Sequence, residues 1–522
     1  MEPVAGTDLQ EEVLSYLGTA AAHKLPVAPL RIDTHCSVAF LAGDDVYKVK
    51  RAIKLPFLDY STIEKRKYFC ELEFTINRKL SPDLYRGVVA ITRAGQGFEL
   101  GGCGEVVEWA VHLRRFDENQ TLDRLAEAGE LDLLIIRDLA AAVSKAHADA
   151  RTIRNGHATE ALGNVVEETL NELAQAPDVF PRREVTEFGR SMRMAFREMR
   201  GPLMIREATG HVRRCHGDLH LRNIVMVDDK VSLFDAIEFD EAIATTDILY
   251  DLAFLLMDLW EKDLKGEANV VLNRYLWQSG DMIDMLSGLS ALPLFMSLRA
   301  AIRAKIAALH ASPTARHRST EARLYFETAR EFLEPCRPSL IAIGGRSGTG
   351  KSTLASSLAP HIGRPPGAIH LRSDIERKRE FHVAETTRLP SAAYRPEASC
   401  RVYEALERQA AAALASGQSV IVDATFLDTF EANAVAQIAK HAKADFRGIW
   451  LDAPTGLLMR RLHNRTNDAS DATAAVLRAQ PTPAPAPEAW ICLDASRSAG
   501  DTCHAAMRCL RLQPQPVRHL AS

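Results

Sequence analysis

Hydrophobic and polar positions alternate along the first part of the chain and then change to a helical period. From Arg31, short apolar runs bounded by turn residues predict strands. These runs occupy residues 37–41, 46–50, 88–92 and 106–116. A helix is predicted at residues 61–80, with Ser61 as its N-cap. From Leu122, apolar residues recur every three or four positions, which predicts a mainly helical region. Its helices are expected over residues 122–155, 165–174, 185–199, 252–260, 270–277, 293–310 and 321–333.

The last part of the chain alternates between short apolar runs and helical segments. The runs lie at residues 340–343, 368–371, 419–422, 446–451 and 490–493. Strands that alternate with helices are typical of a doubly wound parallel sheet. Pro335 and Pro338 mark a linker before this part. The prediction is an α/β and α+β multidomain protein. Its parts are an N-terminal extension (1–30), a first domain (31–336, with lobes at about 31–118 and 119–336) and a second domain (339–522).

Composition and charge narrow the class of protein. A chain of 522 residues is too long for one core, and 47% hydrophobic with 25% charged residues is ordinary for a globular protein. A net charge of −4 argues against nucleic-acid binding. The nine cysteines form no CxxC pair, which indicates reduced thiols in a cytoplasmic protein. We expect neither a signal peptide nor a membrane span, since the first residues lack a basic and apolar leader and no run of eighteen apolar residues occurs.

One polar stretch carries the spacing of a phosphotransferase catalytic loop. It runs from His216 to Asn223 and reads HGDLHLRN, so that an acid, Asp218, precedes the amide Asn223 by five positions. This pair is typical of a catalytic base and a metal ligand. The next residues predict a short hairpin that returns Asp235 to the loop. Two acids and an amide at one point can hold Mg²⁺ and a triphosphate.

At these residues the chain resembles the aminoglycoside phosphotransferase family, whose signature is HGDLHxxN followed by a strand that ends in Asp. The resemblance implies a bilobal protein-kinase-like fold, with Asp218 as base and Asn223 and Asp235 as Mg²⁺ ligands. It also implies that His216 and Asp251 support the catalytic loop, Asp251 by accepting backbone hydrogen bonds. Asp251 is also a helix N-terminal acid favoured by the macrodipole, and the two interpretations are compatible.

The same resemblance assigns an ATP-binding lysine to the strand at 46–50. Lys48 and Lys50 share one face of this strand because side chains alternate. Lys48 is the first choice for the phosphates and Lys50 the second, against the alternative of an edge strand with solvated lysines. Glu73, ahead of Glu71, is expected to pair with this lysine, although a solvated acid on a helix face is an equal alternative. No Gly-x-Gly-x-x-Gly precedes the strand: residues 34–37 stand in its place, which predicts weak nucleotide affinity or another phosphate cover.

A complete P-loop follows the strand at 340–343 and precedes a helix, which is the context that the motif requires. Its backbone N–H groups and the helix N-terminus are suited to phosphate. Lys351 is expected to reach the β- and γ-phosphates, and Ser352 to bind Mg²⁺. The alternative is a chance glycine-rich turn. The predicted ATP-binding residues are Gly345, Arg346, Ser347, Gly348, Thr349, Gly350, Lys351, Ser352 and Thr353.

Further residues place this domain among small-molecule kinases. Asp374 lies at a strand tip, where it can orient an acceptor hydroxyl, and with Arg377 it resembles the substrate side of shikimate-kinase-like enzymes. Asp423 ends the strand at 419–422 and is the expected acid near Mg²⁺. Arg461 and Arg465 resemble a phosphate-clamping lid, against the alternative of a basic surface helix.

Taken whole, the chain resembles bacterial proteins in which an aminoglycoside-phosphotransferase-like domain is fused to a P-loop domain. The favoured hypothesis is two ATP- and Mg²⁺-dependent modules that phosphorylate a hydroxyl of a small molecule. A second hypothesis makes only the P-loop domain catalytic and the kinase-like domain a recognition or regulatory module. A third, a nucleic-acid end kinase, is disfavoured by the acidic charge and the lack of interleaved basic and aromatic residues. The family name does not make an aminoglycoside the substrate.

Overall fold

The computed structural model describes residues 7–55, 58–309, 316–465, 468–480 and 490–512. The chain forms two compact units. Unit 1 contains Met1–Leu162 and Met204–Leu255, and unit 2 contains Gly163–Leu203 and Leu256–Ser522. The region predicted as the first domain therefore contributes residues to both units, and its C-terminal helices pack in the same unit as the P-loop domain.

Unit 1 is built on an antiparallel six-stranded sheet with the strand order β1-β2-β3-β8-β6-β7. The strands are β1 (Leu30–Asp33), β2 (Ser37–Ala42), β3 (Asp45–Lys50), β6 (Tyr85–Ala94), β7 (Gly97–Leu100) and β8 (Val106–Arg114). Gly43 has a φ of +61°, which the tight turn between β2 and β3 requires. The two-stranded ribbon of β4 (Lys54–Leu55) and β5 (Leu58–Asp59) leads to the first long helix.

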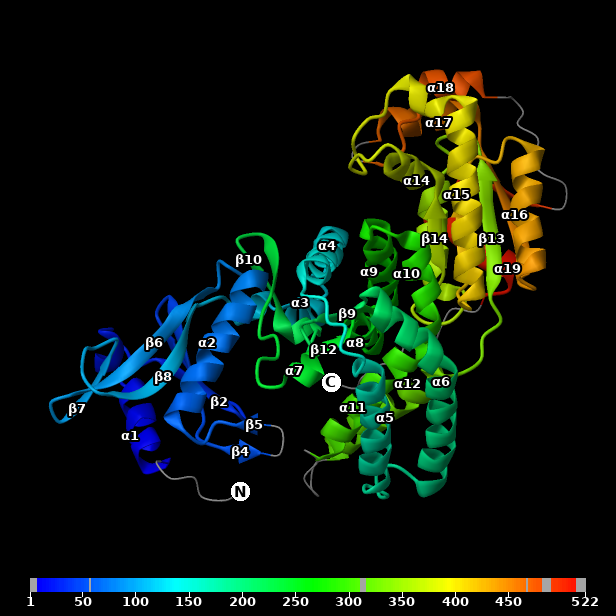
Figure 1. Cartoon of the computed structure of the whole chain (residues 1–522). Coiled ribbons are helices and arrows are strands. Elements are labelled where there is room, and N and C mark those ends of the chain that lie inside the picture. The colour runs from blue at the N-terminus through cyan, green and yellow to red at the C-terminus, as the bar shows by residue number, and fades with distance from the viewer. Residues whose placement is uncertain (1–6, 56–57, 310–315, 466–467, 481–489, 513–522) are drawn as a thin grey trace. The chain divides into compact units, whose positions relative to one another are not determined.

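Two helices cover this sheet. α1 (Thr7–Leu17) packs its buried residues Val13 and Leu14 into one core cluster with Phe40 of β2, so this helix of the predicted extension belongs to the sheet's core. α2 (Ile63–Leu80) lies along β6 and β8 (Figure 1). Its N-cap is Thr62, whose hydroxyl accepts the Lys65 N–H at 3.4 Å, so the expected cap at Ser61 is wrong by one residue.

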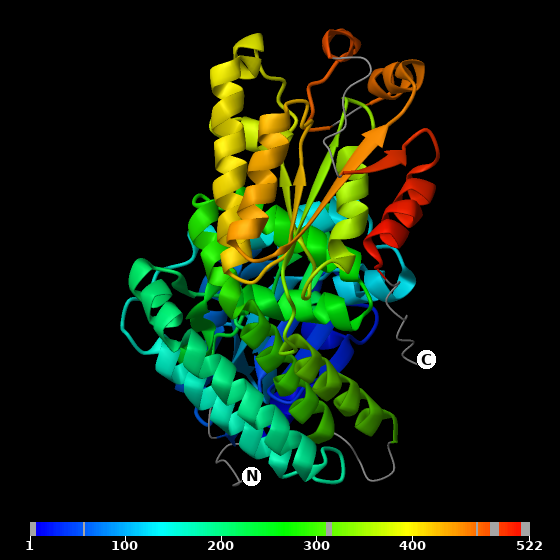
Figure 2. The same ribbon diagram turned by 90° about the vertical axis from the view of Figure 1, so that its right-hand side faces the viewer.

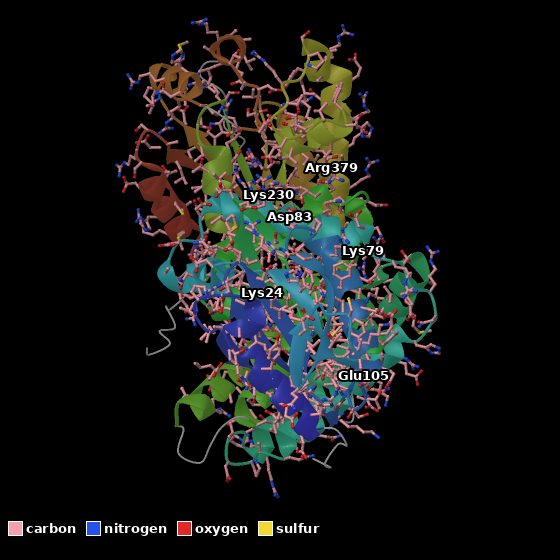
Figure 3. The ribbon with its side chains drawn as sticks, turned by 90° about the vertical axis from the view of Figure 1, so that its left-hand side faces the viewer. Lys24, Lys79, Asp83, Glu105, Lys230 and Arg379 are labelled. Carbon is pink, nitrogen blue, oxygen red and sulfur yellow. The ribbon has the colours of Figure 1, made fainter. Side chains whose placement is uncertain are left out.

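The rest of unit 1 holds residues 216–223, called the catalytic loop here after its predicted role. The loop contains the short 3₁₀ turn η3 (Leu221–Asn223) and leads to the predicted hairpin of β10 (Ile224–Val227) and β11 (Lys230–Leu233). Figure 3 labels Lys230 at the start of β11 and Lys79 near the end of α2. The other elements are α3 (Leu122–Ala128), α4 (Leu133–Asp149), β9 (Val212–Arg214), α7 (Glu241–Ala244), β12 (Thr245–Asp247) and α8 (Ile248–Glu261), which continues into unit 2.

Unit 2 begins with helices. It contains most of α5 (Ala158–Ala174) and most of α6 (Arg182–Thr209), whose remaining residues belong to unit 1. The helices that follow are α9 (Lys265–Gln278), α10 (Met282–Gly288), α11 (Leu292–Leu309) and α12 (Arg316–Phe332). Among the described residues, one helical stretch, Met282–Leu309, has the length and composition of a membrane span, and 78% of its most apolar window is buried inside the protein.

The P-loop domain in unit 2 is a five-stranded sheet with the order β14-β15-β13-β16-β17. All its pairs are parallel, which confirms the predicted doubly wound sheet. Figure 2 shows α15 and α16 on one side of the sheet and α13 and α19 on the other. Its strands are β13 (Ser339–Gly345), β14 (Ile369–Arg372), β15 (Val420–Asp423), β16 (Asp445–Asp452) and β17 (Ile491–Asp494). Its helices are α13 (Lys351–Leu358), α14 (Ser373–Glu380), α15 (Pro396–Ala415), α16 (Thr429–His441), α17 (Thr455–His463), α18 (Ala474–Ala479) and α19 (Ala499–Leu510).

Candidate active sites

The structure brings Lys48, Glu73 and Asp235 together in unit 1. Lys48 Nζ lies 3.0 Å from Glu73 Oε1 and 2.5 Å from Asp235 Oδ1. Glu73 is buried, with 0% of its surface exposed, whereas Glu71 lies on the exposed face of α2 and pairs with Lys67 at 3.8 Å. Glu73 is therefore the residue of α2 that holds the β3 lysine.

The charges of this cluster stabilise one another. Burial alone would lower the pKa of Lys48, but the carboxylates of Asp235 and Glu73 outweigh it and hold that pKa well above its ordinary value. Burial would raise the pKa of Glu73, and here Lys48 and Lys50 outweigh it and lower that pKa. Both groups are therefore charged at neutral pH.

The catalytic loop places Asp218 and Asn223 side by side. Asn223 Nδ2 donates to Asp218 Oδ2 at 2.9 Å and to the Asp218 carbonyl at 3.0 Å. His220 Nε2 lies 3.2 Å from the same carboxylate oxygen, and the Asp218 side chain is 42% exposed. The loop thus presents a carboxylate that a hydroxyl group can reach, next to an amide oxygen suited to a hard cation.

Asp251 anchors this loop from α8. Its carboxylate accepts the His216 N–H at 3.2 Å and the Gly217 N–H at 2.9 Å, and it lies 3.1 Å from His147 Nε2. His147 is thus a partner of Asp251 that the sequence did not reveal. Burial lowers the pKa of His216, whose Nε2–H donates to the Phe234 carbonyl at 2.9 Å. These bonds hold the loop against the strand end that carries Asp235.

The buried trio His147, Cys215 and Asp251 lies within 4.8 Å but does not fit a metal ion. Asp251 already accepts two backbone N–H bonds. Burial and the carboxylates of Asp251 and Asp247 raise the pKa of Cys215 well above its ordinary value, and a metal ligand must be a thiolate. The trio therefore serves the catalytic loop.

A second ion-pair cluster lies beside the first one. Lys50 Nζ pairs with Glu73 Oε2 at 2.7 Å and with Glu238, and Tyr60 donates its hydroxyl to Glu238 at 2.8 Å. From the sequence, Lys50 is only the second choice for contact with ATP, and Glu238 has no predicted role. Lys50 is only 2% exposed, so it supports Glu73 and the segment after Asp235 from inside the protein.

We predict that Lys50→Met lowers the free energy of unfolding by about 3 kcal/mol, because the change leaves the buried Glu238 carboxylate without its cation. Denaturant unfolding of the full chain measures this difference. Lys54→Met removes an exposed lysine and is the control, expected within about 0.5 kcal/mol of the wild type. Equal stability of the two variants would contradict the buried role of Lys50.

The turn at residues 34–37 stands where protein kinases have a glycine-rich phosphate cover. Thr34 Oγ1 donates to the Ser37 carbonyl at 2.9 Å and accepts the Ser37 N–H at 3.0 Å. Hydroxyl groups, not glycines, therefore shape the β1–β2 turn. The turn therefore has no glycine in these positions, as the sequence indicates.

In unit 2 the P-loop has the backbone of a phosphate cradle. Gly345 has a φ of +138°, and a Cβ there would lie 2.4 Å from the Leu451 carbonyl oxygen, so only glycine fits. Lys351 Nζ lies 3.2 Å from the Arg346 carbonyl, and burial lowers the pKa of this lysine. Ser352 donates its hydroxyl to Asp423, which places the two expected Mg²⁺ residues in direct contact. A hydroxyl and a carboxylate both offer oxygen ligands, which Mg²⁺ prefers.

Two residues of β14 lie close to the Asp423 carboxylate, and the sequence did not reveal this contact. His370 Nε2 lies 3.5 Å from Asp423 Oδ2, and Arg372 Nε lies 3.8 Å from the same oxygen. Burial would raise the pKa of Asp423, but His370, Arg372 and Lys351 outweigh it and lower that pKa. Both residues lie in or beside a strand predicted only from its apolar run, which gave them no separate signal.

A cavity of about 1100 Å³ lies over the P-loop. Asp374 and Arg377 line it, as do the P-loop residues from Ser347 to Leu354. The Arg377 guanidinium donates to the Ala393 carbonyl at 2.5 Å and lies 4.9 Å from the centre of the Tyr394 ring. The structure therefore brings the predicted acceptor-side residues and the P-loop to one chamber.

The two expected lid arginines also line this cavity. Arg461 donates to the Arg497 carbonyl at 3.2 Å, and Arg465 donates to the carbonyls of Ser470 and Ala472 at 3.1 and 3.0 Å. Each thus has a backbone partner away from the P-loop. The role in binding phosphate stays a prediction.

Gln480 is a further contact that the sequence did not indicate. Its Oε1 accepts the Ser347 N–H at 3.0 Å, and its Nε2 donates to Ser347 Oγ at 3.0 Å. Gln480 thus bonds a backbone N–H of the P-loop, the kind of group that holds phosphate in this motif. A phosphate at this N–H would have to replace the Gln480 side chain.

Glu431 on α16 gives the cavity a group that titrates near neutrality. Burial is the main cause that raises its pKa to about 7, with a smaller contribution from Asp428, while Tyr403 and Arg377 act in the opposite direction. The carboxyl is therefore about half protonated at pH 7.

We predict a pH-dependent stability difference between the wild type and Glu431→Gln. Because the folded pKa of about 7 exceeds the ordinary value of 4.5, the folded protein keeps a proton that the unfolded chain releases in this interval. The stability due to this proton is fully present below pH 4.5 and is lost as the pH rises through 7. The Tm of the wild type, relative to that of the variant, should fall over this interval and then stay constant. A flat difference would show that Glu431 has an ordinary pKa.

The comparisons with known proteins match one segment of each predicted domain to a family. Residues 95–285 match the "Phosphotransferase enzyme family", and residues 340–484 match an "AAA domain" family of P-loop proteins. These matches confirm both resemblances and the kinase-like fold of the N-terminal region.

Related proteins and solved structures also match this chain, over different shares of its length. Uncharacterized proteins of Mycobacterium tuberculosis (strain H37Rv) and Mycobacterium bovis are each 29% identical over 481 residues, which cover 88% of this chain and 92% of theirs. A choline/ethanolamine kinase family protein from Mesorhizobium loti is 14% identical, covering 62% of this chain and 95% of its own, with a TM-score of 0.38. A sugar kinase from Janibacter sp. HTCC2649 is 19% identical, covering 35% of this chain and 99% of its own, with a TM-score of 0.28. This chain thus joins a phosphotransferase-family domain, matched at residues 95–285, to a P-loop domain, matched at residues 340–484.

Proposed function

We propose that the chain is an ATP-dependent phosphotransferase with two nucleotide sites, each of which phosphorylates a hydroxyl group of a small molecule. One observation carries the proposal: each unit places a partly buried lysine, Lys48 or Lys351, beside carboxylates and the other residues of its motif. Phosphoryl transfer needs such positioning and charge neutralisation more than covalent chemistry.

In unit 1 the acceptor hydroxyl would meet Asp218. As the bond forms between the acceptor oxygen and the γ-phosphorus, the bond from that phosphorus to the β–γ bridging oxygen breaks and ADP leaves. The hydroxyl proton passes to the Asp218 carboxylate. Asn223 and Asp235 are the residues that would hold Mg²⁺, which neutralises phosphate charge when bound. Lys48 would then exchange its contact with Asp235 for the phosphates.

In unit 2 the same transfer would take place in the cavity over the P-loop. Lys351 would contact the β- and γ-phosphates, and Ser352 and Asp423 would hold Mg²⁺. Asp374 lies on the cavity wall and would accept the proton of the acceptor hydroxyl. A cavity of about 1100 Å³ has room for a nucleotide and a second small molecule.

The alternative, in which only unit 2 is catalytic, rests on a different observation. Lys48 contacts the oxygen of Asp235 that a metal ion would use, and the β1–β2 turn lacks the glycines of a phosphate cover. In this case the kinase-like domain recognises a ligand or regulates its partner without transferring phosphate.

The test uses ATP with a radiolabelled γ-phosphate and pools of small hydroxyl compounds. The proposal expects labelled organic phosphate from the wild type, and separate products lost with Asp218→Asn and with Asp374→Asn. Products lost only with Asp374→Asn would favour the alternative. Hydrolysis of ATP without label in any organic product would refute transfer to these compounds.

A further inference from the structure

Helix α9 belongs to the segment that matches the phosphotransferase family, yet it packs in unit 2 against the P-loop domain. Its neighbour is β14, the strand at one edge of the parallel sheet. An edge strand has backbone N–H and C=O groups that no further strand satisfies. Within the described residues β14 pairs with β15 on one side, and α9 provides hydrogen bonds on the other.

Two asparagines of α9, one turn apart, bond the backbone of this edge. Asn269 Nδ2 donates to the carbonyls of Pro366 and Ala368, both at 3.1 Å. Asn273 Nδ2 donates to the Ala368 carbonyl at 3.2 Å, and its Oδ1 accepts the His370 N–H at 2.7 Å. Each asparagine is only 3% exposed, and a buried amide without partners would be costly.

Trp277, a further turn along α9, continues the series. Its Nε1–H donates to the His370 carbonyl at 3.2 Å, so α9 bonds both backbone groups of His370. Three side chains at four-residue spacing thus take the place of a sixth strand. Gly367 fits the same contact, because a Cβ there would lie 2.8 Å from Asn269 Nδ2.

Side contacts reinforce this attachment. Arg274 of α9 forms an ion pair with Glu385, which follows α14. Arg379 of α14, labelled in Figure 3, has its Nη1 2.7 Å from Met282 Sδ of α10. The helices of the kinase-like segment therefore hold both β14 and the helix that carries Asp374.

The edge strand that α9 bonds, β14, also carries the two residues that lie close to Asp423, the proposed Mg²⁺ acid. His370 and Arg372 project to the same face of β14 because side chains alternate along a strand. Both reach Asp423, at 3.5 and 3.8 Å. A displacement of β14 would therefore change the setting of the Asp423 carboxylate beside Ser352.

We propose that α9 is a positioning element of the P-loop site: Asn273 and Trp277 fix β14 so that His370 and Arg372 hold Asp423 at Ser352. The proposal rests on the proposed function in that Asp423 and Ser352 are taken as the Mg²⁺ residues. It makes the helical region of one domain a required part of the other domain's nucleotide site.

The experiment uses the full chain with Lys48→Ala, which confines nucleotide binding to unit 2, as the parent. Calorimetry measures ADP binding over a series of Mg²⁺ concentrations. Asn273→Leu is expected to raise the Mg²⁺ concentration for half-maximal binding about tenfold, and His370→Gln about 10- to 100-fold. The effect of the double variant should be smaller than the product of the two single effects, because both changes act on the same strand. Asn171→Leu, on the exposed surface of α5, is the control and should match the parent.

Trp277→Phe removes a single N–H donor and keeps the ring, so it tests the proposal if Asn273→Leu does not fold. It should raise the Mg²⁺ requirement about threefold. An unchanged Mg²⁺ requirement in the folded variants, or effects that multiply in the double variant, would overturn the proposal. If Lys351→Ala does not change Mg²⁺-dependent binding by the parent, the proposed function of unit 2 fails, which is a distinct result.

Discussion

Replacing Lys351 with alanine should lower Mg²⁺-ATP turnover in unit 2 about a thousandfold. Lys351 is partly buried and lines the cavity, and its charge is the one that the P-loop motif aims at the β- and γ-phosphates. Losing one preorganised donor to the transition state costs about a hundred- to a thousandfold. The measurement is the steady-state release of phosphate in an Asp218→Ala background, which removes the contribution of unit 1.

Lys440→Ala provides the control for this prediction. Lys440 lies on the exposed surface of α16, so its loss should leave turnover within about twofold of the parent. Turnover of Lys351→Ala close to that of Lys440→Ala would contradict a catalytic P-loop.

The second large effect is expected in unit 1. Asp218→Asn keeps the shape of the side chain but removes the carboxylate that accepts the proton. The turnover of unit 1 should fall about a hundred- to ten-thousandfold. It is measured in a Lys351→Ala background, and the KM for ATP should change little because Asp218 does not contact the nucleotide in the proposed step.

Asp229→Asn is the matched control, since Asp229 is an exposed acid in the hairpin turn eleven residues after Asp218. Its positive φ of 60° is one that asparagine also adopts. If Asp229→Asn lowers kcat as much as Asp218→Asn does, the result would argue against Asp218 as the base.

The motifs could be read from the sequence because each is local. Asp218 and Asn223 lie in one loop, and Gly345 to Ser352 form one turn between a strand and a helix. The choice of Glu73 also follows from the helical period: Cys70, Glu73 and Asn77 share the buried face of α2, which Glu71 does not.

The residues that the sequence did not reveal depend on contacts between distant segments. Lys50 and Glu238 are 188 positions apart, and nothing near Glu238 distinguishes it from a surface acid. Asn269 and Asn273 suggest an exposed helix face because asparagine is usually solvated, and only the edge of β14 explains their burial.

Composition located a linker at 335–338 but not the packing of the helices before it. Pro335 and Pro338 interrupt secondary structure, which is a local property. The attachment of α9 to β14 is decided by side chains that lie about a hundred residues from their partners, for example 97 positions between Asn273 and His370. For this reason the two predicted domains and the two compact units differ.

The most direct test of two nucleotide sites is ATP hydrolysis by the wild type, Asp218→Ala, Lys351→Ala and the double variant, each with and without Mg²⁺. We predict that each single change removes a separate part of the Mg²⁺-dependent activity and that the double variant has none. If Lys351→Ala alone removes all activity and Asp218→Ala removes none, unit 1 is not a phosphotransferase and the account of two catalytic sites is wrong.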